Sequence, residues 1–130
     1  MSENLLTNKI IEMESFNEKY RTRTKLFALS VLKILKVKNN SDAFRIMSKQ
    51  LIRCSTSVAA NFRAACRYKS QKDYHYKLSI VIEECDEAYF WLELLTDSDE
   101  IPEEITSPLM KEADELLAVF SKVKSNVSRK

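Results

Sequence analysis

The sequence predicts an all-α fold, an antiparallel up-down-up-down bundle of four helices formed by one domain, residues 1–130. Three observations lead to this prediction. The chain has no glycine among its 130 residues, so the tight turns of β-hairpins and of phosphate-binding loops lack their usual residue. Apolar residues recur at helical spacing in four segments, without a competing strand pattern. The connections between these segments are short, which makes successive helices antiparallel neighbours.

The first two helices are expected at about 13–38 and 41–68, after an N-terminal dozen residues that we expect to fray. The apolar stripe of the first helix consists of Met13, Tyr20, Thr24, Phe27, Val31 and Ile34. Ser41 is a suitable N-cap for the second helix, and Asn61 is expected at one of its core-facing positions. The stripe of the second helix consists of Phe44, Met47, Leu51, Cys54, Val58 and Ala65.

The last two helices are expected at about 71–96 and 107–126, joined by a loop over 96–106. The third helix starts after Ser70, and its stripe consists of Tyr74, Leu78, Val81, Cys85, Ala88, Leu92 and Leu95. Ser107 and Pro108 are predicted to be the N-cap and the first residue of the fourth helix. The stripe of that helix consists of Leu109, Ala113, Leu116, Phe120 and Val123.

Charge is divided unevenly along the chain. Residues 19–82 contain 15 basic and two acidic residues, a balance of +13, whereas residues 83–115 contain 13 acidic and one basic residue, a balance of −12. The net charge of +2 hides this division. Such a division indicates either an electrostatic partner or self-association of the unlike parts.

The chain carries no signal for export, a membrane or a metal. Its polar N-terminus does not resemble a secretion signal, and no apolar run approaches the ~20 residues of a membrane span. The three cysteines, Cys54, Cys66 and Cys85, have no metal-ligand spacing, and their odd number favours a reducing cytoplasm. We therefore expect a cytoplasmic protein with no cofactor and no membrane partner.

A basic surface is predicted on the first two helices. Its residues fall within a narrow arc of each helix at 100° per residue, and on the second helix that arc lies opposite the apolar stripe. Such a ridge suits the phosphates of RNA or DNA, although an ordinary solvated face would show the same pattern. The candidate nucleic-acid-binding residues are Arg21, Lys25, Lys36, Arg45, Lys49, Arg53, Arg63 and Arg67.

The third helix is apolar on two sides, which a helix of an isolated four-helix bundle does not need. Opposite its stripe lie Tyr76, Ile80, Trp91 and Leu94, mixed with Glu83 and Glu87. This strip is typical of a protein interface, unless the first helix or the N-terminal segment folds across it. As an interface, it could meet the basic second helix of a neighbour and form a ring, with Arg53 or Arg63 against Glu84 or Glu87 of the next subunit.

An enzyme is a weaker interpretation of this sequence. His75 is the only histidine, so a di-iron bundle, which uses two Glu-x-x-His motifs, is excluded. A helical-bundle ribonuclease of the HEPN type pairs an arginine with a histidine four to six residues away. Arg67 and His75 are separated by seven residues, with a helix break expected between them. No catalytic residue is therefore predicted.

A resemblance to a known family is carried by two adjoining segments, RCSTSVAANFRAACR (53–67) and KSQKDYHYKLSIVIEECDEAYFWLELL (69–95). They resemble the bacterial four-helix-bundle family of the 23S rRNA intervening sequence protein, also called the S23 ribosomal protein family. The likeness extends from about Tyr20 to Lys124. Members usually have glycine where Ser55 and Ala59 stand here and glutamate where Ala64 stands.

The resemblance implies a cytoplasmic homopentamer without established catalytic residues. A related branch, the accessory variability determinant of diversity-generating retroelements, binds a reverse transcriptase and nucleic acid through a basic surface. Two interpretations remain open on the sequence. One is a non-enzymatic oligomeric protein that binds nucleic acid or a ribonucleoprotein. The other is a protein-interaction scaffold whose basic face only forms salt bridges between subunits.

Overall fold

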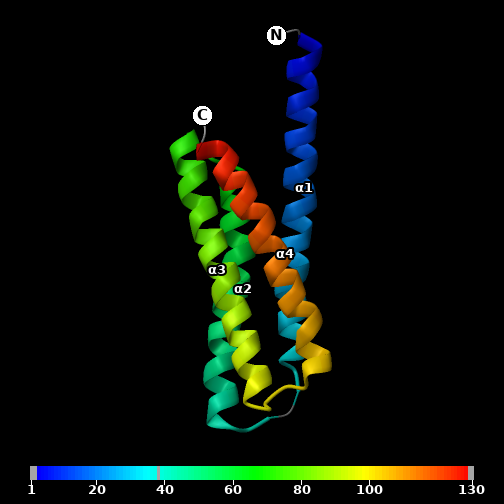
Figure 1. Ribbon diagram of the computed structural model, residues 1–130, viewed down its shortest axis with the longest axis vertical. Helices are drawn as coiled ribbons and strands as arrows, with labels where there is room; N and C mark the ends of the chain where they lie inside the picture. The colour runs from blue at the N-terminus through cyan, green and yellow to red at the C-terminus, as the bar shows by residue number, and fades with distance from the viewer. Residues whose placement is uncertain (1–2, 38, 129–130) are drawn as a thin grey trace.

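Four helices make up most of this computed structural model, which describes residues 3–37 and 39–128. They are α1 (Glu3–Ile34), α2 (Asp42–Ala65), α3 (Gln71–Asp97) and α4 (Glu103–Ser128). In Figure 1 the helices run alternately down and up, so the predicted antiparallel four-helix bundle is confirmed. Helices α1 and α3 both pack against α2 and α4 but not against each other in the described residues, and therefore lie diagonally opposite.

The predicted stripes of α2, α3 and α4 form most of the core. Every stripe residue of α2 is buried, as are those of α3 from Leu78 to Leu95 and those of α4 from Leu109 to Phe120. An aromatic group closes the core near the end where α4 finishes: the Phe120 ring lies 5.7 Å from Tyr20 and 4.9 Å from Phe62, centroid to centroid. None of the helices within the described ranges is long and apolar enough to cross a membrane.

Helix α1 begins at Glu3, ten residues before the predicted start, and its N-terminal part is not frayed. Residues 3–12 contain neither glycine nor proline, and an acidic Glu3 in the first turn suits the positive end of the helix dipole. This segment projects beyond the end of the bundle (Figure 1). Met13, predicted to lie in the core, is 42% exposed and instead lines a hollow at this end of the bundle.

The N-caps of α2 and α3 are the predicted serines. Ser41 Oγ accepts a hydrogen bond from the Phe44 backbone N–H at 2.9 Å, and Ser70 Oγ accepts one from Asp73 N–H at 3.1 Å. Helix α2 ends at Ala65, three residues before its predicted end. Helix α1 ends at Ile34 and is followed by a turn, earlier than predicted; the predicted end at Lys38 lies outside the described residues.

Helix α3 ends in a motif that usually contains glycine, although this chain has none. Asp99 adopts a left-handed conformation with φ of 62°, which costs an aspartate less than most residues. The Glu100 N–H then reaches the Leu95 carbonyl at 3.0 Å and the Asp99 N–H reaches that of Thr96 at 3.0 Å. These two bonds are those of a Schellman motif, in which glycine usually occupies the left-handed position.

The predicted start of α4 at Ser107–Pro108 is wrong. The helix starts at Glu103, directly after Pro102, whose carbonyl accepts from Ile105 N–H at 3.0 Å. Pro108 therefore lies inside the helix, one turn after the start, and omits a single backbone hydrogen bond. Thr106, expected in a loop, is fully buried on this first turn and hydrogen-bonds Thr96 Oγ1 through its hydroxyl at 2.6 Å.

Candidate functional site

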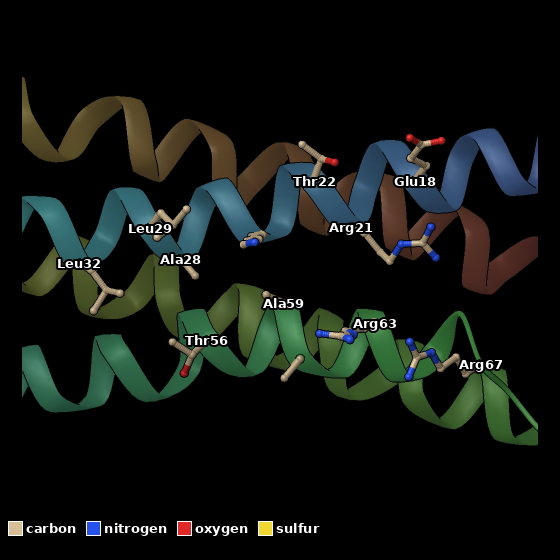
Figure 2. A pocket seen from close by; sticks show the side chains of 12 residues that line it. Glu18, Arg21, Thr22, Ala28, Leu29, Leu32, Thr56, Ala59, Arg63 and Arg67 are labelled. Carbon is tan, nitrogen blue, oxygen red and sulfur yellow. The ribbon is translucent and has the colours of Figure 1, made fainter.

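A groove of about 750 Å³ runs along the outer surface between α1 and α2. Four of the predicted basic residues line it: Arg21 and Lys25 from α1, Arg63 from α2, and Arg67 from the turn directly after α2. Figure 2 shows Arg21 reaching from α1 toward α2, near Arg63 and Arg67. Because α1 and α2 are antiparallel, residues about 40 positions apart in the sequence meet at one end of the groove.

The other end of the groove is apolar. Its lining there includes Ala28, Leu29 and Leu32 from α1 and Ala59 from α2. Leu29 and Leu32 are 41% and 38% exposed, although both are large apolar side chains. Ala59 stands at a position where the family resemblance implies glycine in other members. Its small side chain lines the groove without filling it. The groove therefore joins a cationic half to an apolar half.

The four groove cations form no ion pair with a carboxylate in the part of the chain that the structure describes. All four side chains are exposed, and Glu18 is the acidic residue in the groove lining. Burial raises the pKa of the neighbouring Cys66 thiol, and the positive charge of Arg21 partly opposes that rise. The groove thus presents a positive surface to solvent.

The remaining predicted basic residues lie elsewhere, and two of them have carboxylate partners. Arg45 pairs with Asp42 on its own helix and donates to the Asn40 carbonyl. Arg53 binds both Glu84, at 3.1 Å, and Glu87. The Arg53 pair that the sequence suggested between subunits is therefore formed within one chain. Lys36 and Lys49 are exposed but do not line the groove.

The outer strip of α3 is partly exposed. Tyr76 is 64% exposed and Leu94 37% exposed, and Phe90 beside them is 48% exposed. Trp91 is half-buried, with its indole N–H donated to Glu87 Oε2 at 3.2 Å. Ile80 is also half-buried, whereas Glu83 is exposed. The alternative in which the first helix covers this strip is wrong, since α1 does not contact α3 in the described residues.

Burial keeps the two cysteines of the core in their neutral form. Burial raises the pKa of Cys54 and of Cys85 to about 12, so both thiols stay protonated near neutral pH. Among the described residues, no group of three or more histidine, cysteine or acidic side chains is arranged to hold a metal ion. Asn61, predicted to face the core, is half-buried, and its amide donates to the Ser57 carbonyl at 3.0 Å.

Sequence reasoning missed the exposed apolar residues of α1. Leu6 and Ile10 near the N-terminus are 55% and 50% exposed, and Leu26 farther along is 54% exposed. The signal was available, because Leu6, Ile10 and Met13 continue the spacing of the α1 stripe. A helix that starts only at residue 13, as predicted, leaves Leu6 and Ile10 outside this stripe.

By its fold and this surface, the protein is a small up-down helical bundle with an open basic groove on one face. The chain belongs to the 23S rRNA-intervening sequence protein family, whose sequence model matches residues 9–122. It is similar to a solved crystal structure of a protein of unknown function from the S23 ribosomal protein family of Bacteroides thetaiotaomicron VPI-5482. The two share 28% identity and a TM-score of 0.77 over 84% of this chain and 97% of the other. No curated protein matches the chain.

Proposed function

We propose that this protein is a non-enzymatic nucleic-acid-binding protein whose α1–α2 groove receives a phosphate backbone. The observation that carries the proposal is the set of four cations, Arg21, Lys25, Arg63 and Arg67, gathered from α1, α2 and the turn after α2 without carboxylate partners in the described residues. Arginine and lysine side chains of this kind contact phosphates and release counterions from the nucleic acid.

The lining of the groove favours recognition of the backbone over recognition of bases. None of the side chains that line it is aromatic, and aromatic platforms are what usually hold the unstacked bases of single strands. Phosphate contacts fix position but carry no direct sequence information. We therefore propose that the ligand is a double-stranded or folded nucleic acid, bound with little sequence preference.

The test compares two double charge reversals, one inside the groove and one outside it. Arg63→Glu/Arg67→Glu is expected to abolish binding of a short labelled double-stranded RNA, because both side chains line the groove. Arg45→Glu/Lys49→Glu makes the same change in net charge outside the groove and is expected to keep most of the affinity. Equal loss in both variants would mean that overall charge, not the groove, determines binding.

A non-enzymatic role has its own readout in the same samples. The RNA is expected to keep its full length after prolonged incubation with the protein. Cleavage that disappears in His75→Ala would show that the protein is a nuclease and would contradict this part of the proposal.

A second candidate function, a self-associating scaffold, is favoured by the exposed apolar residues on α3. Tyr76 and Leu94 are exposed in a strip that also contains acidic Glu83, which suits contact with a basic neighbour. The family resemblance implies a cytoplasmic pentamer and a reverse transcriptase partner, and both are equally part of the nucleic-acid-binding proposal above. Light scattering of Leu94→Glu tests the scaffold: a mass equal to that of the parent protein would exclude this strip as an assembly surface.

A further inference from the structure

The N-terminal arm, residues 3–15 of α1, stands outside the bundle with an uncovered apolar stripe. All of its residues are exposed. At 1.5 Å per residue the arm is about 20 Å long, and Met13 near its root borders the end of the bundle. Leu6, Ile10 and Met13 follow one another at intervals of four and three residues, and the same alternation leads through Tyr20 into the buried part of α1. The face that packs inside the bundle thus continues past its end (Figure 1).

A hollow of about 320 Å³ lies where the arm leaves the bundle. Its lining includes Phe16 of α1, Tyr74 of α3 and Val123 of α4, together with Tyr68 from the connection between α2 and α3. Asn17 also lines it, and the Oδ1 atom of that side chain is buried without a hydrogen-bond partner among the described residues. The apolar stripe of the arm therefore leads directly into an apolar hollow that contains an unsatisfied acceptor.

The arm and this end of the bundle carry opposite charges. Residues 3–14 contain three acidic residues and one basic residue. The bundle end, formed by residues 16–22, 66–73 and 119–128, contains seven basic and two acidic residues. An arm does not lie over its own bundle end, because it projects away from that end. A second copy, turned around, would bring its acidic arm over the basic end of the first.

We propose that two copies of this chain pair through their N-terminal arms in an antiparallel arrangement. The four-and-three spacing fixes the register: Leu6 of one copy lies opposite Asn17 of the other, and Ile10 lies opposite Met13. Each arm tip then covers the hollow at the root of the other arm. The contact is isologous, so each arm pairs with one other arm. This pairing does not depend on nucleic-acid binding.

Of the three residues in this stripe, Leu6 lies before the segment that matches the family model, and Ile10 and Met13 lie within it. Residues 3–8 precede the segment that matches the family model, which begins at residue 9.

The first experiment measures mass in solution by sedimentation equilibrium. The variant Leu6→Asp/Ile10→Asp is expected to have half the mass of the parent protein, with a dissociation constant raised at least tenfold. Its thermal melting is expected to equal that of the parent protein measured at a concentration too low for pairing, because neither side chain contacts its own bundle. The control Asn8→Asp/Ser15→Asp adds the same charge on the opposite face of the arm and is expected to keep the parental mass.

Several outcomes would overturn the proposal. A parental mass in Leu6→Asp/Ile10→Asp, or an equal loss of mass in the control, would show that the stripe does not pair. A parent protein that is not paired but sediments with phosphatidylcholine vesicles would assign the arm to a lipid surface instead.

The second experiment tests the antiparallel register by disulfide cross-linking in a Cys66→Ser background, since Cys54 and Cys85 are buried. Ile10→Cys/Met13→Cys is expected to give a covalent dimer on mild oxidation, because residues 10 and 13 of the two copies face each other. Leu6→Cys alone is expected to stay unlinked. Efficient linking of Leu6→Cys would instead indicate parallel arms and would refute the register.

Discussion

Removing one groove cation should reduce the salt dependence of nucleic-acid binding by the contribution of one phosphate contact. If four cations contact phosphates of a duplex, the slope of log Kobs against log salt is about −3.6, four times −0.9. The affinity then falls about 150-fold between about 50 and 200 mM salt. Arg67→Ala leaves three contacts, a slope of about −2.7, and a fall of about 40-fold over the same range.

The control for this measurement is Arg45→Ala. The Arg45 guanidinium is bound by Asp42 and lies outside the groove, so its removal should leave the slope near that of the parent protein. Fluorescence anisotropy of a labelled RNA duplex at several salt concentrations gives the slope directly. A slope for Arg67→Ala equal to that of the parent, or an equal change in Arg45→Ala, would refute the assignment of phosphates to this groove.

Three further predictions concern stability. Arg23→Met removes the hydrogen bonds from Arg23 to Glu112 and should lower the free energy of unfolding by about 1–2 kcal/mol in urea; zero coupling in a cycle with Glu112→Gln would contradict this. Asp99→Gly relieves the left-handed backbone and should raise that free energy by about 0.5–1 kcal/mol; a lower melting temperature would argue against it. The pKa values of Cys54 and Cys85 are raised from 9.0 to about 12 in the fold. The stability that depends on the two neutral thiols is therefore complete below pH ~9 and is lost toward pH ~12, by about 1.4 kcal/mol per pH unit for each thiol. An unchanged alkaline slope in Cys54→Ala would disprove this account.

The core of α2 and α3 could be predicted from periodicity because both helices are packed along most of their length. Leu51 and Leu92 lie on four-and-three stripes and are fully buried. The same rule failed at Met13, since periodicity indicates which face of a helix is apolar and not what covers that face. At this end α1 extends beyond the neighbouring helices (Figure 1). No local sequence signal within α1 marks where those helices end.

The start of α4 could not be predicted because both prolines of the chain suit a helix beginning. Pro102 and Pro108 each fix φ at a helical value and lack the N–H that a first turn does not use. The choice is made by tertiary contacts: Thr106 is buried against Thr96 only if the helix starts at Glu103. Sequence patterns around a single proline do not contain that information.

The candidate site was found only in part. The helical arc on α2 correctly grouped exposed cations, but it also included Arg53, whose partners Glu84 and Glu87 come from α3. An arc on one helix does not reveal which residues a neighbouring helix contributes. Arg21 joins Arg67 across the groove because of helix packing, and that juxtaposition appears only in three dimensions.

The diagonal position of α1 has a consequence for the order in which the molecule opens. Helix α3 packs extensively on both α2 and α4, whereas α1 packs on α2 and touches α4 much less. Amide protons of α1 should therefore exchange with deuterium through local opening at a lower free energy than those of α3. Half of the groove belongs to α1, so a ligand bound there stabilises the closed form alone and should slow exchange along α1 first. Hydrogen exchange of the α1 amides would thus report occupancy of the groove.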